Sequence, residues 1–198
     1  MRKLLLAAAV LCTATAAQAS IVPVLLSVTP EGDLFRYSYQ GTLSGDSGVT
    51  TGSKLVIFDF AGFSGGFQVP SPFITASTEL SSGMFSPGNT DDPNIENLVF
   101  TWNGPDFHTS GGEFDQTQFE GLSVLSTANL VGLDGYSATT IKNNGEATGT
   151  PEVNAGTVEV PLFAAGVPEP ATWGLMILGL GGVGSMVRRR RRGQTAFA

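Results

Sequence analysis

Near the C-terminal end of the chain, a proline-rich segment, an uncharged apolar segment and a block of arginines follow one another, and this order constrains the fold more than any other feature. Pro168 and Pro170 each fix φ and lack an N–H group, so the backbone around them is extended rather than helical. Residues 171–187 contain no charged side chain. A helix of that length, at about 1.5 Å per residue, spans about 25 Å, close to the thickness of a bilayer core. The sequence therefore predicts a hinge at residues 164–170 and a transmembrane helix at residues 171–187.

Both ends of this apolar segment carry residue types that favour membrane interfaces. Trp173 lies at one end, where an indole ring prefers the headgroup region. Five consecutive arginines lie at the other end: Arg188, Arg189, Arg190, Arg191 and Arg192. Under the positive-inside rule they stay in the cytoplasm, so residues 188–198 are predicted to be a cytoplasmic basic tail. We interpret the arginines as a stop-transfer signal rather than as a nucleic-acid site, because they directly follow an apolar span.

This arrangement resembles a known sorting signal. The sequence PEPATW at residues 168–173, the Gly-rich apolar span and the arginine cluster are similar to the PEP-CTERM signal of Gram-negative bacteria in its PEPxxWA form, with Gly174 in place of Ala. The resemblance implies that an exosortase recognises Pro168, Glu169 and Pro170. It also implies a precursor anchored in the inner membrane with its domain in the periplasm, then delivery to the cell surface or extracellular matrix. The same segment is also called the C-terminal domain of ice-binding proteins, which we take as a label of the tag.

The N-terminal end of the chain predicts a removable export signal. A positively charged pair is followed by an apolar segment, and Ala17 and Ala19 fit an A-x-A cleavage site. The apolar segment is too short to span a bilayer comfortably. We therefore predict a signal peptide at residues 1–19, removed by signal peptidase so that the mature chain begins at Ser20.

Cysteine content and charge limit what the remaining domain, residues 20–163, can be. Cys12 is the single cysteine and lies in the predicted signal peptide, so disulfides and thiolate metal sites are excluded from the mature chain. The domain is long enough to bury a core of its own. It contains sixteen Asp and Glu residues against three basic ones, a net charge of about −13. An acidic domain repels phosphate backbones, so we expect no nucleic-acid partner.

Residues 20–163 predict an all-β domain. The composition favours strands and turns over helices, and short apolar or alternating runs are separated by turn residues. The expected strands are residues 22–28, 34–40, 54–60, 73–78, 97–102, 119–126, 136–142 and 157–163. About eight short strands with frequent turns indicate an antiparallel β-sandwich, jelly-roll-like in connectivity.

The same runs predict which side chains face the core. In residues 34–40 the aromatic residues alternate with polar ones and are expected on one face. Residues 54–60 are apolar on both faces, which predicts a central strand with Val56, Phe58 and Phe60 on one of them. Turn-forming residues predict loops at residues 45–52, 62–66, 86–94 and 103–112.

Two patterns found in hydrolases are present but incomplete. Residues 62–66 match the G-x-S-x-G pattern of esterases, which needs a helix after it, and prolines at positions 70 and 72 exclude that helix. Residues 45–48 match the serine loop of chymotrypsin-like proteases, but the single histidine, His108, follows the serine instead of preceding it. We therefore expect no enzymatic activity; a hydrolase, the remaining alternative, would depend on His108.

Two groups of acidic residues are candidate calcium ligands, the first formed by Asp91, Asp92 and Glu96 and the second by Asp106, Glu113 and Asp115. Calcium takes six to eight oxygen ligands, which loop carboxylates supply. Neither group has EF-hand spacing, and the alternative for both is a solvated acidic loop that keeps a secreted protein soluble. No other cofactor is expected.

Three aromatic residues, Trp102, Phe107 and Tyr136, would bind sugar if they lay side by side on one surface. The alternative for Trp102 is a core position, because it continues the apolar run at residues 98–100. The sequence as a whole indicates an exported cell-surface or matrix protein with a structural or adhesive β domain. The alternative is a carbohydrate-binding module that binds extracellular polysaccharide.

Overall fold

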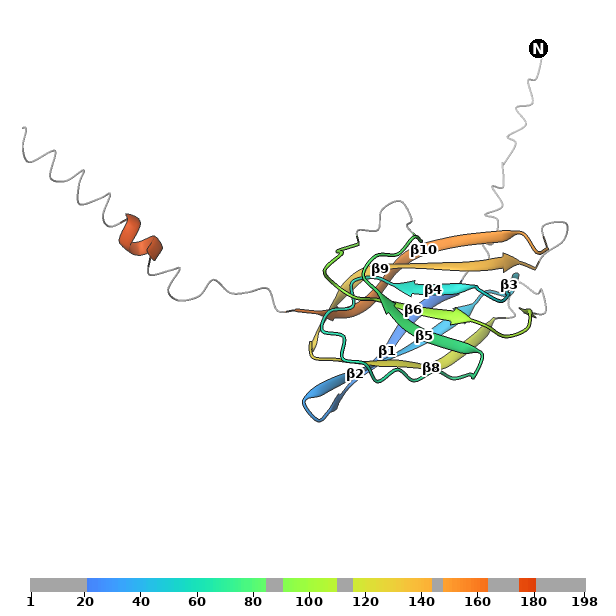
Figure 1. Ribbon diagram of the computed structural model, residues 1–198, viewed down its shortest axis with the longest axis horizontal. Helices are drawn as coiled ribbons and strands as arrows, with labels where there is room; N and C mark the ends of the chain where they lie inside the picture. Colours follow the sequence, from blue (N-terminus) through green and yellow to red (C-terminus); the bar gives the residue numbers. More distant parts are fainter. Residues whose placement is uncertain (1–20, 85–90, 110–115, 144–147, 164–174, 181–198) are drawn as a thin grey trace, which may run out of the picture. The chain divides into compact units, whose positions relative to one another are not determined.

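The computed structural model describes residues 21–84, 91–109, 116–143, 148–163 and 175–180. It divides the chain into two compact units, residues 1–163 and residues 164–198. The described part of the first unit is an antiparallel β domain (Figure 1), which confirms the predicted all-β class. The predicted signal peptide lies outside the described residues.

Ten strands are present in the described part of the chain: β1 (Ile21–Glu31), β2 (Leu34–Leu43), β3 (Ser47–Val49), β4 (Lys54–Ile57), β5 (Ile74–Glu79), β6 (Asn97–Trp102), β7 (Phe107–His108), β8 (Thr117–Ser126), β9 (Leu130–Lys142) and β10 (Pro151–Leu162). A three-stranded sheet has the order β1-β2-β8, and a seven-stranded sheet has the order β5-β6-β4-β9-β3-β7 with β10 paired to β9. Eight of the ten strands overlap the eight that the sequence predicts.

Strands β3 and β7 are a correction, because the sequence predicts loops at residues 45–52 and 103–112. Gly48 of β3 pairs with Ile141 of β9 on one side and with His108 of β7 on the other. A Cβ atom at Gly48 would lie only 2.5 Å from His108 Nδ1 and 2.9 Å from the backbone oxygen of Phe107, so glycine allows this close approach. Segments of two or three residues are too short to show an alternating pattern. Only their pairing with neighbouring strands identifies β3 and β7 as strands.

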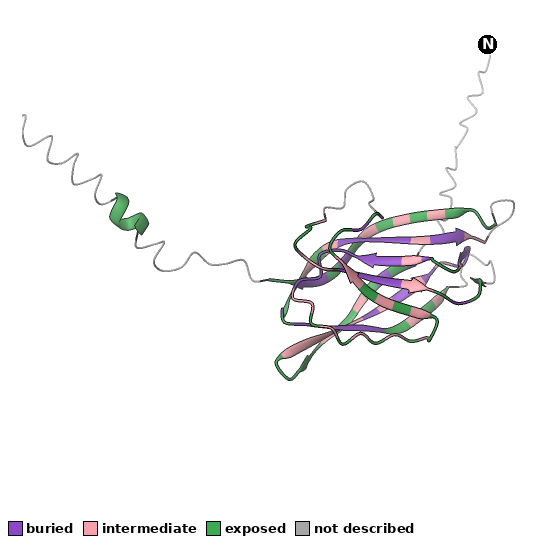
Figure 2. Cartoon of the chain, viewed as in Figure 1, coloured by how far each residue is buried: buried purple, intermediate pink, exposed green. Residues whose placement is uncertain are grey.

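The two sheets share one core. Tyr37 and Tyr39 of β2 are fully buried and contact the same cluster as Ile57, Leu98 and Val160 from the seven-stranded sheet. Figure 2 shows buried positions on strands of both sheets. The expected alternation in residues 34–40 is therefore confirmed, and it directs the tyrosines inward.

Tyrosine hydroxyls also connect the two sheets. The Tyr39 hydroxyl donates a hydrogen bond to the backbone oxygen of Glu159 in β10, at 3.0 Å. The Tyr37 hydroxyl lies 3.2 Å from the backbone oxygen of Ala128 and 3.3 Å from that of Leu130. Each buried hydroxyl thus has an acceptor outside its own sheet, as a buried polar group requires.

One predicted side-chain direction is wrong. Val56 and Phe58 pack with Val99 in a second cluster that Met84 partly covers, but Phe60 belongs to the main core. Strand β4 ends at Ile57, and Asp59 has a φ of 50°, which interrupts the alternation. Phe60 therefore turns inward and packs edge-on against Tyr37, with ring centroids 5.5 Å apart.

Only residues 175–180 of the second unit are described, and they are helical. The other residues of the predicted span 171–187 lie outside the described ranges. No helix within the described residues has the length and apolar character needed to cross a membrane.

Candidate functional site

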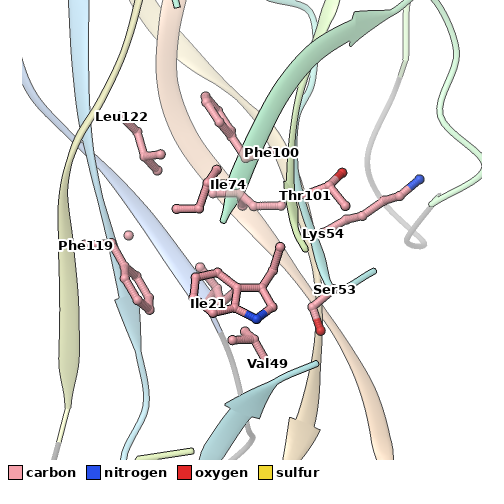
Figure 3. Close-up of a pocket in the computed structure, with 12 residues that line it drawn as sticks. Ile21, Val49, Ser53, Lys54, Ile74, Phe100, Thr101, Phe119 and Leu122 are labelled. Carbon is pink, nitrogen blue, oxygen red and sulfur yellow. The ribbon is translucent and has the colours of Figure 1, made fainter. Parts of the chain in front are cut away.

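An apolar pocket of about 50 Å³ lies between the two sheets (Figure 3). Its apolar lining comes from both sheets: Ile21, Gly41, Phe119 and Leu122 from the smaller one, and Val49, Leu55, Ile74, Phe100 and Trp102 from the larger one. Ser53, Lys54 and Thr101 add polar atoms, and the Lys54 side chain extends away from the pocket (Figure 3). The mainly apolar lining of this pocket suits a small apolar group rather than an ion.

The three aromatic residues that the sequence offers as a sugar platform do not form one surface. Tyr136 is buried in the main core, whereas Phe107 on β7 is 36% exposed. Trp102 packs against the core, and its indole Nε1 donates to the backbone oxygen of Pro105 at 2.9 Å. The structure therefore supports the core interpretation of Trp102, whose side chain is also among those that line the pocket.

Two aromatic pairs that the sequence analysis missed lie at this end of the domain. Phe73, which is 46% exposed, packs against Trp102 with ring centroids 5.6 Å apart. Phe107 packs against Phe119 at 6.5 Å. The alternation of Phe119 with polar residues in residues 117–120 was the available signal for its inward direction. Nothing local indicated that Trp102 and Phe119, one ring from each pair, line the same pocket.

The first acidic group uses its carboxylates to order a loop. Asp91 accepts hydrogen bonds from the Asn97 side chain at 2.9 Å and from the Ser82 backbone at 3.2 Å. Asp92 accepts two from Asn94, which lower the pKa of its carboxyl. For Glu96 the structure gives a backbone contact, with its carbonyl accepting from Phe60.

Asp59 joins this group, although the sequence analysis did not select it. Its Oδ1 accepts from the Asp92 backbone at 2.9 Å, and its own N–H donates to Asn97 Oδ1 at 2.8 Å. Burial, together with the charges of Asp134, Asp91 and Asp92, raises the pKa of Asp59 to about 6. Burial also raises the pKa of Asp134. The site is therefore one where negative charge is disfavoured at neutral pH.

Within the described ranges, no three His, Cys, Asp or Glu side chains are grouped to hold a metal ion. Calcium binding by Asp91, Asp92 and Glu96 stays a prediction, which the thermal stability of the protein before and after chelation would test. In the second acidic group Asp106 is exposed, and Glu113 and Asp115 lie outside the described residues.

The hydrolase patterns have other structural roles. Residues 62–66 form an irregular segment along β8, where the Ser64 N–H donates to the Leu125 oxygen at 2.9 Å, and turns rather than a helix follow it. The structure does bring the serine loop close to the histidine, because Gly48 pairs with His108. Ser47, however, is fully buried and hydrogen-bonded to Ser44, so its hydroxyl is shielded from any substrate.

The described part of the C-terminal tag is apolar on every side. Leu175, Met176, Ile177, Leu178 and Leu180 are each at least 60% exposed. A helix without a polar face is suited to an apolar medium. The sorting residues Pro168, Glu169, Pro170 and Trp173 and the five arginines at 188–192 lie outside the described ranges, as do Ala17, Ala19 and Ser20.

Comparison with known proteins identifies this tag. A family model described as the PEP-CTERM protein-sorting motif matches residues 166–192, which include every sorting residue that the sequence analysis selected. No curated protein and no solved structure matches the chain. Residues 166–192 are therefore a PEP-CTERM protein-sorting motif, which implies an exported, surface-sorted protein that exosortase processes.

Proposed function

We propose that this protein is a structural or adhesive component of the cell surface or extracellular matrix, and that its β domain is the cargo of the sorting motif. The observation that carries the proposal is the sorting motif at residues 166–192, which begins three residues after Phe163, the last described residue of the β domain. Signal peptidase removes residues 1–19. The apolar span 171–187 then holds the precursor in the inner membrane, with the β domain in the periplasm.

The chemistry in this scheme belongs to the processing enzymes, and the chain itself is their substrate and has no enzymatic activity. A stable β domain suits a structural role. In this one, two sheets share one core and tyrosine hydroxyls form hydrogen bonds between them. Three crossings between the sheets, from β2 to β3, from β7 to β8 and from β8 to β9, support a β-sandwich of jelly-roll-like connectivity. Its net negative charge keeps the exported domain soluble.

The test is mass spectrometry of both termini of the protein from its native host, combined with cell fractionation. We expect an N-terminus at Ser20 and a C-terminus that lacks the apolar span, in the surface or extracellular fraction. Replacing Pro168, Glu169 and Pro170 by alanine should leave the span attached and the protein in the inner membrane. The matched control replaces Gln194 and Thr195, beyond the motif, and should mature normally. Normal maturation of the triple variant would refute the proposal.

A second function, binding of surface polysaccharide, is favoured by the aromatic pairs beside the apolar pocket. Phe73 and Phe107 expose ring surface next to Trp102 and Phe119, and exposed rings stack on sugar faces. Titration of polysaccharide extracted from the host should show binding that Phe73→Ala weakens. Phe163→Ala, which also removes an exposed ring, is the control. Binding unaffected by Phe73→Ala would assign the aromatic pairs to packing.

A further inference from the structure

Two buried acceptors at one end of the domain have no hydrogen-bond partner. Asn154 Oδ1 and Thr140 Oγ1 are the buried side-chain atoms for which the described part of the chain provides none. Buried polar atoms in native proteins are almost always paired, so each such atom requires an explanation. Their position in the fold suggests which donor is missing.

Both atoms lie near the beginning of β1. Asn154 Nδ2 donates to the backbone oxygen of Ile21 at 3.1 Å and lies 3.4 Å from the Tyr136 hydroxyl, which leaves Oδ1 directed elsewhere. Residues two apart on a strand share a face, so Glu152 lies on the same face of β10 as Asn154. Thr140 is the register partner of Glu152 on β9. The three side chains therefore share one face, the face that meets Ile21.

Glu152 supplies negative charge at this place. Its side chain is only 13% exposed, and its carboxylate lies 3.7 Å from Lys142 Nζ, a long ion pair. The cation next to Glu152 is Lys142 on β9. The charged residue of β2, Arg36, is the register partner of Thr29 near the other end of β1, so it lies far from Glu152. A largely buried carboxylate beside two acceptors is suited to a group with several N–H donors and a positive charge.

The direction of β1 shows which group can reach it. Ile21 contacts Asn154, whereas Tyr39, the register partner of Leu25, bonds to Glu159. Strand β1 therefore runs alongside β10 in the same direction, and its first residue, Ile21, lies at the end of β1 that is directed toward Glu152. Asn154 and Glu152 are two residues apart, about 6.6 Å along an extended strand at about 3.3 Å per residue. A backbone nitrogen one residue before Ile21 is separated from the Ile21 carbonyl by a similar length of extended chain, so it can reach Glu152.

We propose that Glu152, Asn154 and Thr140 form a binding site for an ammonium group, and that its occupant is the α-amino group of Ser20 in the mature chain. The inference rests on the proposed removal of residues 1–19. In the precursor the same nitrogen is an amide with one N–H and no charge. Hydrolysis of the bond between Ala19 and Ser20 converts it into an ammonium with three donors, one for each acceptor side chain. Maturation thereby stabilises the exported domain.

The test compares thermal unfolding of chains with defined first residues. Chains that begin at Ser20, Ala19 or Ala17 and end at Ala198 are released from a fusion partner in vitro and unfolded in detergent at pH 6.5. The chain that begins at Ser20 should have the highest Tm, by about 3 °C or more. The near-isosteric variant Glu152→Gln should abolish the advantage. Glu159→Gln, on the exposed face of the same strand, should keep it.

A pH series supplies a second readout. A bound ammonium has a raised pKa, so its stabilising effect is complete below about pH 7.7, the ordinary α-amino value, and is lost as the pH rises through the raised value. The advantage of the Ser20 chain should therefore disappear at alkaline pH. Equal Tm values for the three chains, or an equal advantage in Glu152→Gln, would overturn the proposal.

This experiment is independent of export, because the first residue is set in vitro. A native N-terminus other than Ser20, found together with a stabilised Ser20 chain, would refute the predicted cleavage position and support the ammonium site. A native N-terminus at Ser20, found together with a Ser20 chain that is no more stable than the longer chains, would support the predicted cleavage position and refute the ammonium site.

Discussion

Replacing Asp59 by asparagine should stabilise the β domain at neutral pH and leave its stability unchanged near pH 4. Asp59 is 7% exposed and has a pKa of about 6, raised by burial and by the charges of Asp134, Asp91 and Asp92. For an acid with a raised pKa, the neutral form favours folding, and this contribution is complete below the unfolded pKa of about 4. It is lost as the pH rises through 6, so the wild-type domain is penalised at pH 7.

The size of the effect follows from the shift. About two pKa units correspond to about 3 kcal/mol, and screening by water and salt reduces this to about 1–2 kcal/mol. For a domain of this length we expect a rise in Tm of about 3–8 °C at pH 7.5. Asparagine keeps the oxygen that accepts the Asp92 N–H, and it tolerates the φ of 50° at this position.

The assay is thermal unfolding of wild type and Asp59→Asn between pH 4 and pH 8. Asp33→Asn, at the exposed turn between β1 and β2, is the matched control for removing one negative charge. The gain from Asp59→Asn should increase with pH, whereas the control should show little change. A variant that is less stable at pH 7.5, or a gain that is the same at every pH, would refute this account of Asp59.

Three further predictions concern the sheets, a turn and the tag. Tyr39→Phe removes the hydroxyl that bonds to Glu159 and should lower the free energy of unfolding by about 1 kcal/mol in urea. Gly62→Ala should cost more than Gly32→Ala: both glycines have positive φ, but a Cβ at Gly62 meets neighbouring atoms and one at Gly32 meets none. Urea titration should show about 1 kcal/mol for Gly32 and at least about 2 kcal/mol for Gly62. Replacing residues 188–192 by glutamine should reduce retention in the inner membrane, and wild-type fractionation would contradict the stop-transfer interpretation.

The local pattern of apolar and polar residues was sufficient to predict most of the strands. In residues 34–40 aromatic and polar residues alternate, and in residues 97–102 an apolar run lies between turns; both segments became strands with the expected burial. Such patterns are readable because strand periodicity is a property of consecutive residues. Phe60 shows the limit of this rule, since a single left-handed residue at Asp59 reverses the face on which the next side chain lies.

Of the candidate sites too, some could be predicted from consecutive residues and others only from the fold. The sorting motif is a linear signal, so its residues can be identified in sequence order and the family comparison matches the same segment. The pocket could not be predicted, because Ile21, Trp102 and Phe119 come from strands far apart in the chain. The acidic loop was selected from Asp91 and Asp92, yet the carboxyl with the pKa of about 6 is Asp59, which only the fold brings to them.

The sequence by itself determined that this chain is an all-β domain followed by a sorting tag, because alternation, turn residues and the apolar span act over neighbouring residues. Only the tertiary structure decided which strands pair, that β3 and β7 exist, and that Asn154 lies against Ile21. These contacts depend on how two sheets close over one core. Their free energies come from groups far apart in the chain, and no local pattern records which of those groups will meet.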